Sequence, residues 1–325
     1  MVVSDLIGDN FTKIFFMAIS WKGVFPALTT KFTANDQLDI PAFAKNLRFQ
    51  LECGVDGVIL GGSLGEASVL TSEEKEKLVK FTVDTVEDRV PVVLNIAEGS
   101  TREAIRQAEY AKAWGARGLM LLPPMRYAAD HREVVTYFRT IADSTDLPIM
   151  IYNNPTDYKT EVTLDMFEEL AESANIQAVK ESTRDVTNVT RMINRFGKRF
   201  ALLCGVDTLA MEELLMGADG WVAGLVCAFP AETVAIYRLV KAGRIEEALA
   251  IYRWFMPVLE LDIHVKLVQY IKLAEVQTGI GTEYVRAPRL PLIGKERERV
   301  LKIIGECVAS RPALPSLSSV RTALV

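Results

Sequence analysis

Eight short β-rich runs alternate with longer segments of helical period from Val24 onward, and this alternation limits the chain to a few folds. Runs that are almost entirely apolar, such as residues 90–94, are typical of parallel strands buried on both faces. Repeated βα units build either a closed barrel or an open doubly wound sheet. The count of eight, and the lack of a Gly-x-Gly-x-x-Gly sequence after the first run, favour an α/β fold of the (β/α)8 TIM barrel type. The expected strands are Val24–Thr29, Gly57–Leu60, Val90–Asn95, Gly118–Leu122, Pro148–Tyr152, Ile176–Lys180, Phe200–Cys204 and Gly220–Ala223.

Local signals mark where several of the intervening helices begin. Residues 71–74 and 100–103 have the spacing of capping boxes, in which a Ser or Thr side chain and a Glu three positions later satisfy free backbone amides. Thr163 and Asp207 are expected to cap two further helices. After the eighth strand the pattern turns purely helical, which predicts helices appended to the barrel at its C-terminal end.

These patterns divide the chain into four parts. Residues 1–20 form an N-terminal extension of weak pattern, and residues 21–228 contain the barrel strands and their loops. Residues 229–306 are predicted to form the last barrel helix and a C-terminal helical bundle, and residues 307–325 a loose tail. We expect neither end to carry chemistry.

The composition disfavours several classes of function. A net charge of −5, with both signs mixed along the chain, argues against a general nucleic-acid binder. The apolar stretch Ile14–Ile19 is too short to cross a membrane, and no later run reaches that length. The four cysteines lack metal-type spacing and there are only two histidines, so we expect no metal site and reduced thiols in a cytoplasmic protein. The expected partner is a small molecule.

Polar residues at three predicted strand ends are the candidates for chemistry, because TIM barrels place catalytic groups there. Lys180 closes the apolar sixth strand, where partial burial would lower its pKa and supply a neutral amine to attack a carbonyl or imine. Tyr152 ends the neighbouring strand, so its hydroxyl could move protons for that amine. The glycine-rich turn 61–66, with Ser63 and free amides, could bind a carboxylate. Position alone leaves alternatives open, since Lys180 could extend along the rim or pair with Glu181, and Tyr152 could serve in packing.

Taken together, these residues resemble the dihydrodipicolinate synthase and N-acetylneuraminate lyase superfamily from about Val24 to the helical end. The marks of that superfamily are a Gly-Ser/Thr-Thr-Gly-Glu loop, a Tyr-Asn-x-Pro strand end and an Ile/Val-Lys-Glu strand end. This chain carries Gly62-Ser63-Leu64-Gly65-Glu66, Tyr152-Asn153-Asn154-Pro155 and Val179-Lys180-Glu181. The resemblance implies that Lys180 forms an imine with a 2-oxo acid, that Tyr152 shuttles protons and that the Gly62–Ser63 loop holds the carboxylate. It also implies a homotetramer, and we interpret Glu66 as structural.

The chain departs from the synthase pattern at several positions. Leu64 replaces the second threonine of the loop. Synthases carry an arginine two residues past the proline, whereas this chain has Asp157, a charge reversal that weakens binding of the aldehyde substrate's carboxylate. The tyrosine pair that follows the fourth strand in synthases becomes Met125 and Arg126, with Tyr127 one step on. These differences place the synthase reaction, and its proton relay between subunits, in doubt.

Other stretches are similar to a narrower group, the 1-pyrroline-4-hydroxy-2-carboxylate deaminases of hydroxyproline catabolism. They are residues 62–66, 121–125, 220–224 and the helical block from 264–266 through 287–289. For this group the resemblance implies that Lys180 adds to C2 of the cyclic imine and opens the ring. Loss of a C3 proton and of the C4 hydroxyl, followed by hydrolysis, would release ammonia and 2-oxoglutarate semialdehyde without a metal or organic cofactor. We expect Gly62, Ser63, Leu64 and Val222 to lie against the substrate.

Alternative functions remain open. A 2-keto-3-deoxy sugar acid dehydratase or aldolase would use the same lysine but needs more hydroxyl-binding groups, and Leu64 and Met125 are apolar. A dihydrodipicolinate synthase is disfavoured by Asp157. A non-catalytic oxo-acid sensor would keep the pocket without turnover.

Three further residues have open roles. Arg126 either orients the substrate carboxylate or pairs with Asp130 at the start of the next helix. His264 and Lys266 are expected on a helix surface or at a subunit contact.

Overall fold

The runs predicted as strands form a parallel sheet that closes on itself. The computed structural model describes residues 19–124 and 127–316. Its strands are β1 (Gly23–Pro26), β2 (Val58–Leu60), β3 (Val92–Ile96), β4 (Gly118–Leu121), β5 (Ile149–Asn153), β6 (Ile176–Glu181), β7 (Ala201–Cys204) and β8 (Gly220–Ala223). The eight strands found in these residues pair in the order β1-β8-β7-β6-β5-β4-β3-β2, and every pair is parallel. A bridge between Ala27 and Ile59 joins the two ends of that order. The prediction of a (β/α)8 barrel is therefore confirmed.

The first strand is shorter than predicted and ends at Pro26. Beyond the closing bridge, side-chain hydrogen bonds replace the strand ladder. The Thr29 hydroxyl donates to Glu275 Oε1 at 2.7 Å, and the Thr30 hydroxyl donates to the Gly65 carbonyl at 2.7 Å. The chain after β1 is thereby tied both to the loop after β2 and to a helix near the C-terminal end.

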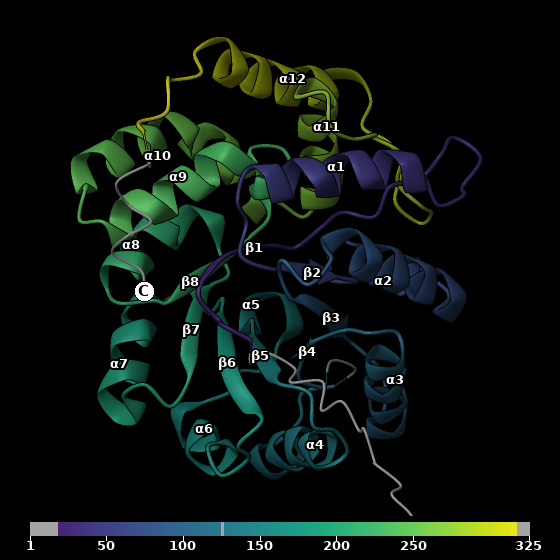
Figure 1. Ribbon diagram of the computed structural model, residues 1–325, viewed down its shortest axis with the longest axis vertical. Coiled ribbons are helices and arrows are strands. Elements are labelled where there is room, and N and C mark those ends of the chain that lie inside the picture. The colour runs from purple at the N-terminus through teal and green to yellow at the C-terminus, as the bar shows by residue number, and fades with distance from the viewer. Residues whose placement is uncertain (1–18, 125–126, 317–325) are drawn as a thin grey trace, which may run out of the picture.

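The helices cover the outside of the barrel and continue beyond it. They are α1 (Ile40–Glu52), α2 (Ser72–Val86), α3 (Thr101–Ala113), α4 (His131–Asp143), α5 (Pro155–Tyr158), α6 (Leu164–Leu170), α7 (Thr187–Phe196), α8 (Ala210–Leu215), α9 (Pro230–Lys241), α10 (Ile245–Leu259), α11 (Leu267–Gln277) and α12 (Gly294–Ala309). A short 3₁₀ turn, η4 (Glu260–Ile263), joins α10 to the segment before α11. Figure 1 shows α9 to α12 gathered on one side of the strands, as predicted for appended C-terminal helices. The last helix runs to Ala309, a little into the segment predicted as a tail.

The predicted helix starts at Thr71, Ser100 and Thr163 are confirmed. Thr71 and Glu74 form a complete capping box at the start of α2. Ser100 accepts from the Glu103 amide, while the carboxylate of Glu103 accepts from Arg106 instead of completing a box. Thr163 accepts from the Met166 amide at the start of α6. Each bond satisfies a backbone N–H that the helix itself leaves free.

The predicted cap at Asp207 is wrong. Its buried carboxylate accepts from Trp221 Nε1 at 2.9 Å, from the Leu225 amide at 2.7 Å and from the Gly224 amide at 3.1 Å. Asp207 therefore stabilises the turn after β8. In this position its carboxylate accepts from three buried donors, whereas a helix cap would normally satisfy one or two backbone amides. An aspartate before a helical segment is a common cap, but here three donors at the end of the neighbouring strand bind the same carboxylate oxygens.

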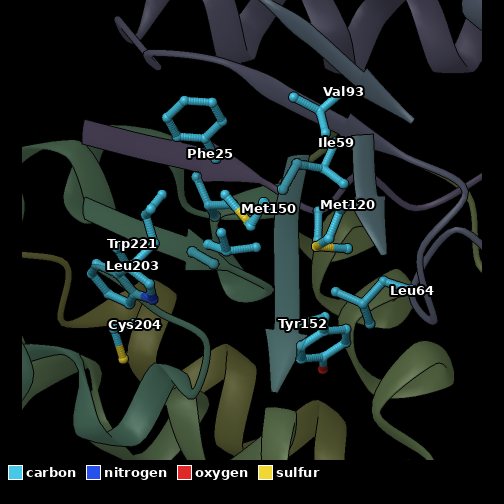
Figure 2. Close-up of a cluster of buried hydrophobic side chains, with 14 of the residues drawn as sticks. Phe25, Ile59, Leu64, Val93, Met120, Met150, Tyr152, Leu203, Cys204 and Trp221 are labelled. Atoms are coloured by element: carbon cyan, nitrogen blue, oxygen red, sulfur yellow. The ribbon is translucent and has the colours of Figure 1, made fainter. Parts of the chain in front are cut away.

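Apolar side chains fill the interior of the barrel. Successive strand residues point to opposite faces, so every second side chain enters the barrel. Figure 2 shows Phe25, Ile59, Met120 and Met150 packed there, with Tyr152 at the end of its strand and its hydroxyl directed away from this cluster. A packed interior leaves the carboxyl ends of the strands as the place where a ligand can enter. No helix in the described residues is long and apolar enough to cross a bilayer.

Candidate active site

The structure places Lys180 and Tyr152 side by side at the mouth of the barrel. They are register partners on β6 and β5, so both side chains point to the same face. Lys180 Nζ lies 3.9 Å from the centroid of the Tyr152 ring. Glu181 takes the opposite face, where its carboxylate accepts from the Thr183 amide and from Asn188 Nδ2. The alternative in which Lys180 pairs with Glu181 is therefore wrong.

The surroundings of Lys180 favour a neutral amine. The residue is only 7% exposed, and this burial lowers its pKa because the charged ammonium loses hydration. The nearby Tyr158, Asp262 and Asp207 act in the opposite direction and raise the pKa. A neutral amine carries the lone pair that attacks a carbonyl carbon.

A glycine on the next strand makes room for this lysine. Gly205 follows β7, and its amide donates to the Glu181 carbonyl at 2.7 Å. A Cβ atom at this position would lie 2.7 Å from Lys180 Cε and 2.1 Å from Ser182 Oγ. Such contacts are too short for a real side chain, so the lysine depends on the absence of one at residue 205.

Tyr152 is oriented by its own chain neighbour. Asn154 Nδ2 donates to the Tyr152 hydroxyl at 3.0 Å and to Asp157 Oδ2 at 2.8 Å. Since that hydroxyl oxygen already accepts from Asn154, its own proton is free to point into the cavity. Burial raises the pKa of Tyr152, so the phenol holds this proton at neutral pH.

The predicted carboxylate loop borders the same cavity, whose volume is about 490 Å³. Gly62, Ser63, Leu64 and Val222 all line it together with Lys180 and Tyr152. Arg126 and Met125 lie outside the described residues. The positions of the loop residues thus agree with the predicted site, and their contacts with a substrate stay a prediction.

Buried ion pairs hold this loop in place. Glu66 adopts a left-handed backbone conformation with φ of 54°, and its side chain is fully buried. Lys272 of α11 pairs with the Glu66 carboxylate, and the Arg286 amide donates to it at 3.1 Å. Lys31 and Glu275 form a second buried pair at 2.9 Å. These contacts support the interpretation of Glu66 as structural.

Several residues at the cavity were not anticipated from the sequence. Tyr158 comes from the short helix α5, and its hydroxyl is hydrogen-bonded to Ser63 Oγ. Arg184, from the loop after β6, and Asp262, from η4, also line the cavity. Nothing in the local sequence pattern marks these three, because their positions depend on loop conformation and on how the appended helices dock.

The expectation for His264 needs correction. This residue lies at the cavity, immediately after η4, rather than only on a helix surface. Its ring stacks on Tyr270 with centroids 4.6 Å apart, and its Nδ1 accepts from the Lys266 amide. Lys266 itself pairs with Glu296 of α12. The chain leaves its helical path after Ile263, which brings the imidazole to the barrel mouth.

This arrangement can support covalent chemistry on a small acid. A desolvated amine, a phenol with a free proton and a loop with hydroxyl and amide donors surround one cavity. Together they can form and hydrolyse an imine.

Comparisons with known proteins agree with this geometry. Residues 20–307 match the model of the dihydrodipicolinate synthetase family. The chain is 32% identical to a 4-hydroxy-tetrahydrodipicolinate synthase of Exiguobacterium sibiricum, over 84% of this chain and 92% of the relative. It is 30% identical to the putative 2-dehydro-3-deoxy-D-gluconate aldolase YagE of Escherichia coli, over 83% and 91%. The structure of YagE in complex with pyruvate superposes with a TM-score of 0.83 at 28% identity, covering 89% of this chain and 99% of that one.

The names of these relatives favour a synthase or aldolase over the predicted deaminase. They agree on the broader class, since all of them belong to one group of lyases with a TIM barrel. The chain therefore belongs to the dihydrodipicolinate synthetase family.

Proposed function

We propose that this protein is a lyase-type enzyme that binds a small 2-oxo acid, or its cyclic imine, as a Schiff base on Lys180. One observation carries the proposal: a buried amine with a lowered pKa lies 3.9 Å from the ring of Tyr152 in a cavity bordered by the Gly62–Ser63 loop. Structural lysines usually place their ammonium in solvent or against a carboxylate. Lys180 instead lines a cavity of ligand size.

The reaction follows from the positions of these groups. Lys180 Nζ adds to C2 of the substrate, and the oxygen or nitrogen that leaves C2 takes a proton from the Tyr152 hydroxyl. The resulting imine is cationic, so it draws electrons from C3 and acidifies the C3 protons. The Tyr152 phenolate then lies beside the adduct and can accept one of them. Ser63 and the loop amides would hold the substrate carboxylate.

For the substrate, we propose 1-pyrroline-4-hydroxy-2-carboxylate, whose conversion releases ammonia. Opening its ring on Lys180 creates a primary amine, which is protonated at neutral pH. Asp157 and Asp262 line the cavity, and burial raises the pKa of Asp262 while a cation nearby lowers it, so the new ammonium would favour the ionised carboxylate and be attracted to it. The same carboxylates would repel the second carboxylate of a synthase substrate. Arg184, also at the cavity, is a cation available to the carboxylate that the substrate does carry.

The second candidate is cleavage or dehydration of a 2-keto-3-deoxy sugar acid. The relationship to YagE in both sequence and structure favours it. The hydroxyl groups of Ser182 and Thr156, which line the cavity, could bind sugar hydroxyls. Both candidates use the same imine on Lys180 and differ only in what leaves the adduct.

One experiment tests the shared chemistry and separates the candidates. The protein is mixed with pyruvate, with the pyrroline or with 2-keto-3-deoxygluconate, reduced with borohydride and analysed by mass spectrometry, with Lys180→Arg as control. We expect a covalent adduct on residue 180 in the native protein and none in the variant. Release of pyruvate from the sugar acid identifies the aldolase. Reduction of NAD⁺ by an added semialdehyde dehydrogenase in the presence of the pyrroline identifies the deaminase.

Two outcomes contradict the proposal. An adduct on Lys180 without turnover of any of these compounds indicates a sensor, and the lack of any adduct excludes Schiff-base chemistry. The homotetramer implied by the resemblance is part of the proposal, and sedimentation analysis of the native protein tests it.

A further inference from the structure

We propose that Tyr158 is a proton-relay residue that connects the Lys180 adduct with solvent through Ser63. This inference rests on the proposed Schiff-base function and adds a residue to it. It means that a single chain supplies the complete relay. The tyrosine pair that follows the fourth strand in synthases is then not required here.

Local structure fixes the position of Tyr158. The helix α5 is a single turn, which begins after Asn154, whose side chain accepts from the Asp157 amide, and is followed by Lys159, a residue with φ of 62°. This turn brings Tyr158 back over the preceding strand end. Its ring meets the ring of Tyr152 edge to face, with centroids 5.7 Å apart. The two phenols thus lie next to each other at the cavity that contains Lys180.

The hydrogen-bonded pair Ser63 and Tyr158 borders two cavities. The first is the cavity of Lys180, and the second, of about 600 Å³, is lined by residues of the loops after β2, β3 and β4. Ser63 and Tyr158, together with Gly62, border both. The second cavity is also lined by Lys75 and Glu98, which are only partly buried and pair at 3.1 Å.

The hydroxyl groups of Ser63 and Tyr158 are both suited to pass a proton. A serine and a phenol can each donate and accept, so a proton that enters one can leave the other. Burial raises the pKa of Tyr158 to about 12, while the charge on Lys180 lowers it. Tyr158 therefore holds its proton in the resting site, and a cationic adduct nearby favours its transient release.

The proposed step balances as follows. The C3–H bond of the imine breaks, its electron pair forms the C2–C3 double bond, and the imine π pair returns to nitrogen. The proton passes to the Tyr152 oxygen. It is exchanged with solvent in the second cavity through Ser63 and Tyr158, and the reverse path returns a solvent proton to C3. No oxidant, reductant or metal takes part.

The test is the exchange of pyruvate methyl protons for deuterium in D₂O, followed by ¹H NMR. Tyr158→Phe removes one oxygen and retains the ring that packs on Tyr152. We expect the exchange rate to fall about 100-fold, a typical contribution of a positioned proton-transfer group, while borohydride still traps the pyruvate adduct. The pyruvate concentration at half-maximal rate should change less than about threefold, since the ring and the loop are retained. Thermal unfolding checks that the variant is folded.

Two further variants show whether Ser63 and Tyr158 act together in the relay. Ser63→Ala should slow exchange to a similar extent, and the double variant should be no slower than either single one, because the two hydroxyls carry the same proton. The matched control is Tyr127→Phe, which alters an exposed tyrosine after β4 and should exchange like the native protein.

Each outcome is decisive. Native exchange in Tyr158→Phe, multiplied losses in the double variant, or a large loss in Tyr127→Phe overturns the relay. A native protein that borohydride cannot trap overturns the proposed function and the relay with it, whereas trapping with unimpaired exchange in Tyr158→Phe overturns the relay alone.

Discussion

Adding one methyl group at Gly205 should disable the protein without unfolding it. The new Cβ of Gly205→Ala would lie 2.7 Å from both Cγ and Cε of Lys180 and 2.1 Å from Ser182 Oγ. Ordinary contacts begin near 3.4 Å, so these side chains must retreat. The lysine is the more flexible of the two, and it borders open space into which it can move.

The expected magnitude follows from this displacement. Moving a reacting atom by about 1 Å costs roughly 100-fold in rate, because the attack depends on orientation. Overpacking of a buried site costs about 1–3 kcal/mol in the free energy of unfolding. Folded domains are typically stable by about 5–15 kcal/mol, so the variant should remain folded with a reduced Tm.

The assay is the rate of pyruvate adduct formation under borohydride, measured beside thermal unfolding. The matched control is Gly305→Ala in α12, where nothing lies within 4 Å of the new atom and alanine should stabilise the helix by about 0.5–1 kcal/mol. Gly305→Ala should form the adduct at the native rate. Native kinetics in Gly205→Ala would refute the view that the placement of Lys180 determines its reactivity.

Three remaining predictions concern charge. Because burial lowers the pKa of Lys180 below 10.5, adduct formation with pyruvate should accelerate with rising pH and level off below pH 10.5. Asp262→Asn removes a carboxylate that raises the pKa of Lys180. The midpoint of the rise in rate with pH should therefore move to lower pH. A move to higher pH would contradict this role of Asp262. Lys272→Met leaves the buried Glu66 with only the more distant Arg289 guanidinium, 3.8 Å away, and should lower the free energy of unfolding by about 3 kcal/mol in denaturant titrations. Adding Glu66→Gln to Lys272→Met should restore part of the lost stability. A double variant that is no more stable than Lys272→Met alone would contradict the ion pair between Lys272 and Glu66.

The sequence was sufficient to predict the barrel and the central pair of the site. Apolar runs and turn signals located all eight strands, and parallel strands necessarily bring the ends of β5 and β6 together. For this reason Tyr152 and Lys180 could be paired before their distance was known. The strand limits were less accurate, as at β1, because side chains from distant segments compete for the last backbone positions.

The rest of the site depends on contacts that no local pattern specifies. Tyr158 reaches Ser63 only because α5 ends after one turn at a left-handed Lys159. Asp262 and His264 reach the barrel mouth because the chain leaves α10 and docks against barrel loops that are distant in sequence, the loop after β2 most of all. Asp207 had a cap signal, yet its partners came from the strand end that follows it.

The buried pairs behind the loop after β2 make the helices of the C-terminal end part of the binding apparatus. On α11, Lys272 pairs with Glu66 and Glu275 pairs with Lys31, although α11 lies about 200 residues later in the sequence. During synthesis, α11 must therefore be complete before the loop after β2 can acquire its final shape. A shortened chain that stops after the eighth strand should therefore fail to bind the proposed ligand, even if its strands assemble into a barrel.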